Sequence, residues 1–291
     1  MRVLILGGDG MLGHRLLHDL SANHQVSVTL RRDLAVYAEF GLFTPENSYD
    51  RVDARDPMRF VDVLGAARPE VVINAIGIVK QREAAHDVVQ SLVINALLPH
   101  RLASLCRVAG ARLIHLSTDC VFVGDRGGYT EEDTPDALDL YGQTKHLGEV
   151  EGEGCISLRT SIIGLELHRK KSLIEWYLGQ TGRFHGFTGA IFTGLTTWEL
   201  SRVIRMLIER FPELHGIFQV VSEPISKHDL LRRLTNLLGR RDITVVPDSG
   251  FQCDRSLRGD RFTAATGYQA PSWDEMLREL AEAIAEREGA K

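Results

Sequence analysis

Three side chains near the middle of the chain have the types and spacing of a proton-transfer site. Tyr141 and Lys145 stand one helical turn apart in the string YGQTK, and Thr118 follows an earlier apolar run. On a helix, such spacing places both groups on one face. We expect the lysine charge to favour the tyrosinate and to lower the phenol pKa from about 10. With the Thr118 hydroxyl holding a carbonyl oxygen and Tyr141 donating a proton to it, the set predicts carbonyl reduction.

A glycine-rich turn lies at the start of the chain, in RVLILGGDGMLG. Gly7, Gly10 and Gly13 form GxxGxxG between an expected strand and an expected helix. Glycine permits a tight turn and lets backbone N–H groups approach a pyrophosphate, which a helix N-terminus also attracts. The pattern predicts dinucleotide binding. A tight turn with only a structural purpose is the alternative.

The residues after the second expected strand bear on the choice of cofactor. Arg31 and Arg32 stand where an arginine accommodates a 2′-phosphate, and they favour NADPH. Asp33 follows directly, and an acidic residue there would bind ribose hydroxyls instead. NADP is therefore predicted, with NAD as the alternative and a solvated surface pair as the other reading of the arginines.

Two further strand ends complete the expected cofactor groove. Asp53 and Ala54 close the third strand, where the aspartate could bond adenine, while the nearby Asp56 precedes Pro57 as a helix cap would. The fourth strand ends in small residues that let ribose and phosphates lie against the backbone: Asn74, Ala75 and Ile76.

Apolar runs alternate with helical patterns through the first half of the chain, as in a parallel sheet covered on both faces. The expected strands are Arg2 to Leu6, Gln25 to Leu30, Ser48 to Ala54, Val71 to Ile76, Arg112 to Ser117 and Cys155 to Thr160. The expected helices are Met11 to Ser21, Pro57 to Ala67, Leu92 to Ala109 and Tyr141 to Glu151. This order predicts an α/β, doubly wound parallel Rossmann sheet.

After Gly164 the pattern changes to charged helical segments. These are Leu173 to Leu178, Thr197 to Phe211, Ser226 to Leu238 and Ser272 to Glu288, with short apolar strings such as Gly216 to Val221. We predict a Rossmann domain over residues 1–163 and a smaller, mainly helical substrate lobe over 164–291. Part of 190–221 is expected to return to the Rossmann domain.

Composition and charge limit the classes of protein to which the chain can belong. A net charge of −5 and a pI near 6.1 argue against a nucleic-acid-binding surface. The one basic cluster, HRKK from His168 to Lys171, is read as a solvated loop, with contact to an anionic substrate as the alternative. The four cysteines are scattered without metal-ligand spacing, which suggests reduced thiols in a cytoplasmic protein. We expect no membrane span and no bound metal.

The strings GGDGMLG, VVINAIG, STDCVF, YGQTK and RTSIIG resemble those of the extended short-chain dehydrogenase/reductases in order and spacing. The nearest likeness is to the dTDP-4-dehydrorhamnose reductase group of sugar-nucleotide-binding proteins. It extends over nearly the whole chain, because FTGLTT, SEPISKHDLL and CDRSL resemble that group's second lobe.

The resemblance implies a role for each matching residue. Tyr141 would be the general acid, Lys145 would bind the nicotinamide ribose and Thr118 would bond the C4 carbonyl. Other positions would line the cofactor: Gly7, Gly10, Met11 and Leu12 at the pyrophosphate, Asp53 and Ala54 at adenine, Ala75 and Ile76 at its middle, and Ser161 and Ile162 at the carboxamide. Asn95 matches an asparagine that orders the active-site helices, with a surface helix residue as its alternative.

The chain departs from the group at the substrate side. Cys120, after Thr118 and Asp119, stands where the group has a substrate-contacting tyrosine, so the sugar is expected to differ. No basic residue adjoins Cys120 in sequence, and we expect a buried, unreactive thiol. Lys80 is either a solvated loop residue or a contact to an acidic substrate group. Arg255 is predicted at the nucleotide diphosphate, with an ordinary salt bridge as the alternative.

The leading hypothesis is NADPH-dependent reduction of the 4-keto group of a nucleoside-diphosphate 4-keto-6-deoxy sugar. A sugar-nucleotide epimerase that retains NAD is one alternative, and a non-catalytic NADP-binding regulatory subunit is another. The expected partner is a nucleotide sugar, and a homodimer is expected only on general grounds. His115 is read as a satisfied core histidine.

Overall fold

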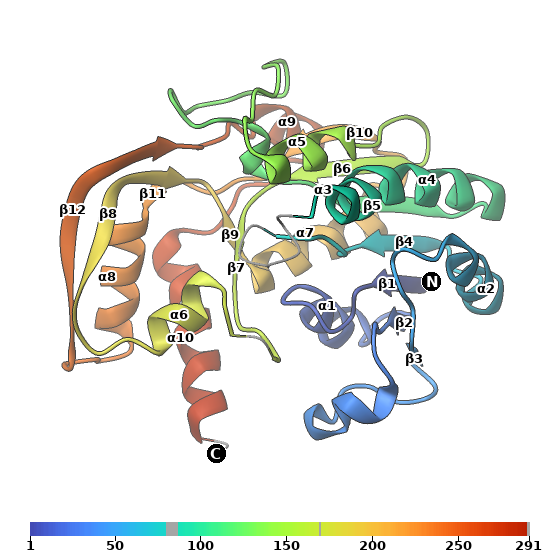
Figure 1. Ribbon diagram of the computed structural model, residues 1–291, viewed down its shortest axis with the longest axis horizontal. Coiled ribbons are helices and arrows are strands. Elements are labelled where there is room, and N and C mark those ends of the chain that lie inside the picture. The colour runs from blue at the N-terminus through green and yellow to red at the C-terminus, as the bar shows by residue number, and fades with distance from the viewer. Residues whose placement is uncertain (80–86, 169, 290–291) are drawn as a thin grey trace.

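The computed structural model describes residues 1–79, 87–168 and 170–289, and a seven-stranded parallel sheet is its largest element (Figure 1). The strand order is β10-β6-β5-β4-β1-β2-β3. The strands are β1 (Arg2–Leu6), β2 (Gln25–Thr29), β3 (Ser48–Tyr49), β4 (Val71–Asn74), β5 (Arg112–Leu116), β6 (Cys155–Arg159) and β10 (Gly216–Gln219). This order confirms the predicted doubly wound Rossmann sheet. Lys80 lies outside the described residues.

Helices cover both faces of this sheet because successive strand residues point to opposite sides. Val3 and Ile5 of β1 belong to the core cluster shared with α1 (Gly13–Leu20) and α7 (Thr197–Arg210). Leu4 and Leu6 belong to the cluster on the other face, with α2 (Pro57–Ala67) and α4 (Leu98–Ala109). Both faces are therefore buried.

The helix α2 begins at the predicted residue for a local reason. Asp56 accepts hydrogen bonds from the backbone N–H groups of Met58 (3.0 Å) and Arg59 (3.3 Å). Pro57 occupies the first turn, where a missing N–H costs nothing. Asp56 is thus the helix N-cap, as its position before proline suggested.

A long apolar helical segment crosses one face of the sheet. It runs from α3 (Val88–Ser91) through one π-helical stretch (Leu92–Leu97) into α4. By length and mean hydropathy (1.2), Val88–Ala109 meets the criterion for a membrane-spanning helix, as a core helix also can. In this fold its α4 part packs against β5 and α2.

A second lobe is built around a smaller sheet in the order β11-β8-β12. Its strands are β8 (Gly182–Phe192), β11 (Ile225–Ser226) and β12 (Ile243–Asp254), and its helices are α6 (Leu173–Leu178), α8 (Lys227–Leu237) and α10 (Trp273–Gly289). The helix α9 (Asp260–Thr266) packs instead against β10 of the large sheet. The strands β8 and β12 are not among those expected from the sequence. Their side chains are mostly half-buried or exposed and β8 is interrupted by glycines, so neither strand forms a continuous apolar run.

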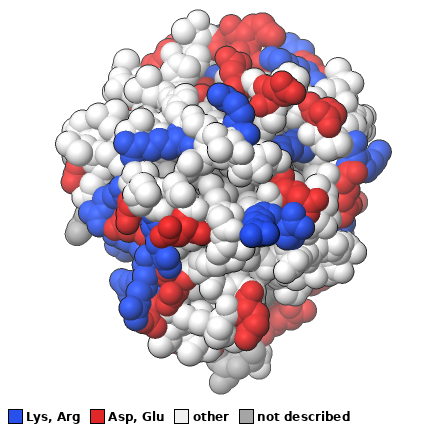
Figure 2. Space-filling view, turned by 90° about the vertical axis from the view of Figure 1, so that its right-hand side faces the viewer, with Lys and Arg blue, Asp and Glu red and all other residues white. Residues whose placement is uncertain are grey.

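Segments before and after β8 return to the large sheet and its helices. β7 (Ile162–Ile163) pairs with β9 (Leu195–Thr196), α7 packs on α1, and β10 adds to the edge beside β6. The boundary between the two domains, placed between residues 163 and 164, stays a prediction. On the face shown in Figure 2, basic and acidic side chains are interspersed.

Candidate active site

The glycine turn joins β1 to α1 at the carboxyl edge of the large sheet. Gly7 has φ +86°, and its N–H donates to Thr29 Oγ1 (3.0 Å) at the end of β2. A Cβ on Gly13 would overlap the carbonyl oxygen of Gly7, so the helix approaches the strand as only glycine allows. No side chain caps the N-terminus of α1 at Leu12. The turn fits a pyrophosphate, because its backbone is accessible at close range and the first helical turn attracts anions.

The predicted adenosine end lies beside this turn. Arg31 and Arg32 follow β2 with exposed side chains. Asp33, which would favour NAD, bonds the N–H of Ala35 and forms an ion pair with Arg51. Its carboxylate is thus engaged in capping the 3-10 helix Leu34–Phe40. This engagement favours the arginines as the groups that meet the cofactor.

Asp53 and the half-buried Ala54 occupy the end of the next segment. A hydrogen-bonded ion pair with Arg55 lowers the pKa of Asp53 to about 2, and the charge of Arg31 contributes. The structure therefore brings Asp53 close to Arg31, as a common adenosine site requires. Their contact with a cofactor stays a prediction.

The residues at the end of β4 lie in two different surroundings. Ile76 lies against the glycine turn, since its Cγ1 is 3.1 Å from the position of a Cβ on Gly7, and Ala75 lies beside it. Asn74 instead is fully buried, with Nδ2 3.1 Å from His115 Nδ1 and Oδ1 accepting the N–H of Ile76. The side chain of Asn74 therefore supports the sheet, and contact of this residue with a cofactor stays a prediction.

Thr118 and Tyr141 meet at the end of β5. Thr118 Oγ1 donates to Asp119 Oδ1 (3.1 Å) and accepts the N–H of Cys120 (3.2 Å), and the phenol of Tyr141 is near enough for Thr118 to lower its pKa. Tyr141 stands in the first turn of α5 (Leu140–Leu147), which Asp139 caps through the N–H of Gly142 (2.9 Å). The predicted hydroxyl pair is thus assembled.

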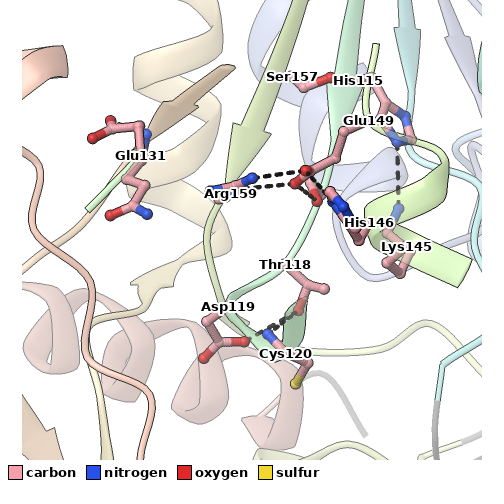
Figure 3. Close-up of polar contacts among 12 residues, drawn as sticks. His115, Thr118, Asp119, Cys120, Glu131, Lys145, His146, Glu149, Ser157 and Arg159 are labelled. Carbon is pink, nitrogen blue, oxygen red and sulfur yellow. Dashed lines mark hydrogen bonds and ion pairs between the residues drawn. The ribbon is translucent and has the colours of Figure 1, made fainter. Parts of the chain in front are cut away.

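Lys145 lies one turn further along α5 and is 4% exposed. Its Nζ donates to the carbonyl oxygen of Leu116 (2.6 Å) and lies 3.5 Å from His115 Nε2 (Figure 3). Burial lowers the pKa of Lys145 to about 8. The ammonium is therefore held at the strand end that carries Thr118.

The expected depression of the Tyr141 pKa is wrong for this structure. Burial raises that pKa, the neighbouring Cys120 and Asp119 raise it further, and only Thr118 lowers it. The Lys145 ammonium is bonded to the Leu116 carbonyl instead of contributing to the phenol. Tyr141 consequently keeps its proton through neutral pH, which is the form that a general acid requires.

Arg255 reaches this site from the second lobe, directly after β12. Its Nε and Nη2 donate to the carbonyl oxygens of Phe122 (2.8 Å) and Val123 (3.2 Å). Although burial lowers the pKa of Arg255, the neighbouring Cys120 and Asp119 raise it overall. Cys120 is half-buried, so the expectation of a buried thiol is wrong, and the fold brings the guanidinium of Arg255 near it although the two are distant in sequence. Contact of Arg255 with a diphosphate stays a prediction.

The loop after β6 carries the residues that are predicted to lie at the nicotinamide carboxamide. Ser161 is half-buried, and its carbonyl oxygen accepts the N–H of Leu195 (2.9 Å), while the neighbouring Ile162 belongs to β7. This contact ties the predicted carboxamide position to the segment leading into α7.

Other buried polar residues support the candidate site, and the sequence indicated their roles more weakly. Asn95 is buried in the π-helical stretch and bonds both backbone groups of Ile78 and the hydroxyl of Thr144 on α5. His115 is a buried, bonded histidine as expected, but its contact with Lys145 makes it part of the site. The pair Glu149 and Arg159 was missed, since its partners are joined only by the fold.

The chain is similar to several known proteins. Residues 1–163 match the family model described as the RmlD substrate binding domain. A probable dTDP-4,6-dihydroxy-2-methyloxan-3-one 4-ketoreductase of Streptomyces antibioticus is 28% identical over 267 residues, covering 86% of this chain and 81% of that protein. Methionine adenosyltransferase 2 subunit beta of Rattus norvegicus is 33% identical over 150 residues, covering 51% of this chain and 41% of that protein.

A solved structure shows the same fold. It is the dTDP-4-dehydrorhamnose reductase of Bacillus anthracis in complex with NADP, with a TM-score of 0.77 and 22% identity. The match covers 96% of this chain and 98% of that one.

Proposed function

The chain belongs to the RmlD substrate binding domain family, and from that premise we propose that it is an NADPH-dependent reductase of a nucleoside-diphosphate 4-keto-6-deoxy sugar. One observation carries the proposal. Thr118 lies near enough to the phenol of Tyr141 to influence its pKa, and Lys145 is buried one turn away at the same strand end. The name of the Streptomyces antibioticus relative, a 4-ketoreductase, supports the reaction class.

Each side chain has a definite task in the proposed reaction. Bound NADPH supplies the hydride. The hydroxyl of Thr118 holds the sugar C4 oxygen beside Tyr141, whose phenol gives that oxygen a proton. A positioned proton donor contributes about 10²–10⁴-fold to the rate. Lys145, fixed by the Leu116 carbonyl, places a positive charge near the oxygen that becomes an alkoxide.

Arg31 and Arg32 are the proposed contacts of the cofactor 2′-phosphate, and Arg255 that of the substrate diphosphate. The guanidinium groups of Arg31 and Arg32 suit phosphate because their donors form a fixed fork. Arg255 has Nε and Nη2 on the carbonyl oxygens of Phe122 and Val123, so its proposed contribution is mainly its positive charge. The NADP complex of the structurally similar reductase is in keeping with this cofactor. A cytoplasmic location and a homodimer remain part of the proposal.

The regulatory-subunit alternative has one specific observation in its favour. About half of the chain is 33% identical to a methionine adenosyltransferase beta subunit. The match covers 41% of that protein, so its role is not transferred to this chain.

An assay with purified protein separates the possibilities. NADPH would be offered with 4-keto-6-deoxy sugars of dTDP, UDP, GDP and CDP, and both cofactor absorbance and the alcohol product would be measured. We expect oxidation of NADPH with one of these. No oxidation with any sugar, together with copurification of a larger enzyme, would support the regulatory role. Tightly bound NAD and turnover without added reductant would support the epimerase.

A further inference from the structure

A buried carboxylate, that of Glu149, lies just after α5. Its side chain is 2% exposed and receives hydrogen bonds from Arg159 Nε (2.8 Å) and Nη2 (2.9 Å), Ser117 Oγ (2.7 Å) and His146 Nδ1 (3.1 Å). Figure 3 shows Arg159 and His146 converging on Glu149, with Lys145 nearby. One carboxylate thus satisfies donors from three parts of the fold.

Each of the three donors is next to a residue of the proposed site. Ser117 directly precedes Thr118 at the end of β5. Arg159 ends β6, two residues before Ser161, and His146 directly follows Lys145 on α5. The carboxylate therefore joins the segments that hold the sugar oxygen, the cofactor and the ammonium.

Glu149 also supplies the negative charge that acts on Lys145. The ammonium faces His115 of β5, with His100 of α4 beyond that ring, and neither of these buried or bonded imidazoles provides a negative charge. Burial lowers the pKa of Lys145, and the charge of Glu149 opposes that effect. Although burial raises the pKa of Glu149, its bonds with Arg159 and its other donors lower it to about 2, so the carboxylate stays ionised.

We propose that Glu149 is a positioning residue, which fastens the strand ends of Thr118 and Ser161 to α5 and supports the buried ammonium of Lys145. The proposal rests on the reductase function proposed above. It differs from a purely structural salt bridge because it links Glu149 to the protonation of one particular lysine.

The test is Glu149→Gln, which removes the charge and keeps the shape. Lys145 loses its proton as pH rises through about 8, so removal of the carboxylate should move this loss to lower pH. We expect the alkaline limb of kcat/KM to shift downward by about one pH unit, the size typical for loss of a neighbouring opposite charge. Glu149→Asp, which keeps a carboxylate on a shorter stem, should restore most of the shift.

The second lobe offers a matched control. Glu175 has a side chain that is 2% exposed and pairs with Arg287 through two hydrogen bonds (2.6 and 3.2 Å), remote in sequence from Lys145. Glu175→Gln should lower the melting temperature as Glu149→Gln does, because each leaves an arginine without its ionised partner, although Arg287 is half-buried and Arg159 is buried. It should leave the alkaline limb in place.

A readout without turnover keeps this proposal separate from the enzymatic one. The chain has six lysines, so NMR titration of ¹³C-labelled lysine side chains can follow Lys145, assigned with Lys145→Met. A lower pKa in Glu149→Gln supports the proposal even if no keto sugar is reduced. An unmoved Lys145 pKa in both Glu149→Gln and Glu149→Asp would overturn it. If Glu149→Gln does not fold, Glu149→Asp alone should show a smaller shift in the same direction, and no shift there would also overturn the proposal.

Discussion

Charged groups at the carboxyl ends of β5 and β6 are buried, whereas the side chains along β8 and β12 of the second lobe are mostly half-buried or exposed. Lys145 is 4% exposed and Arg159 is 2% exposed, but β12 has a single buried residue among its twelve. Close packing fixes positions and makes every change costly. The difference suggests that the sheet edge fixes the chemistry while the lobe can vary with the substrate.

The largest expected effect is on kcat, and it should distinguish a tyrosine of the proposed site from a tyrosine of the second lobe. Tyr141→Phe removes the proposed proton donor and should reduce kcat by about 10²–10⁴-fold, with little change in NADPH affinity. Steady-state kinetics and cofactor titration measure both. Retention of the full rate would refute the assignment of the general acid.

Tyr177→Phe in the second lobe is the control for this change. The Tyr177 hydroxyl donates to Thr235 Oγ1 (3.0 Å) in the core between α6 and α8. Its loss should cost about 0.5–1.5 kcal/mol of unfolding free energy and leave kcat unchanged.

Two aromatic residues test the same difference in packing. Phe122 is fully buried and stacks on Tyr129 with ring centroids 4.2 Å apart. Phe122→Ala should lower the free energy of unfolding by about 3–5 kcal/mol. Phe251 is 45% exposed and contacts Phe187, so Phe251→Ala should cost only about 0.5–1.5 kcal/mol. Similar losses in urea titrations would contradict the contrast between the regions.

Two glycines extend the comparison to the backbone, and the second of them should give the smallest effect. A Cβ on Gly13 would overlap backbone at Gly7, whereas one on Gly189 would meet the end of the flexible Gln252 side chain. Gly13→Ala should destabilise by about 1–3 kcal/mol and weaken NADPH binding. Gly189→Ala should change stability by less than about 1 kcal/mol. Thermal melts with and without NADPH would show whether this order holds.

The sequence predicted the first half of the fold well because its signals are local. Arg2 to Leu6 is a short apolar run that ends at glycine, and the predicted range is the observed strand. Asp56 and Pro57 mark the start of α2 equally directly. β8 and β12 gave no such signal, since glycines interrupt one and the other is mostly exposed.

The sequence identified the main residues of the candidate site, but it did not predict the direction in which the pKa of Tyr141 is shifted. Spacing alone placed Tyr141 and Lys145 on one helix face. The direction of the Tyr141 pKa depends on burial and on Cys120, and the position of Arg255 beside Cys120 depends on contacts between distant segments. These are properties of the completed fold that no local pattern encodes.

The placement of β10 has a consequence for how the protein can be made. This edge strand pairs with β6 only after the chain has passed through β8 and α7. A nascent polypeptide leaving the ribosome would therefore expose the flank of β6 until residue 219 emerged. A fragment ending at residue 163 would keep that flank open permanently, and an unpaired strand edge of this kind invites association between copies.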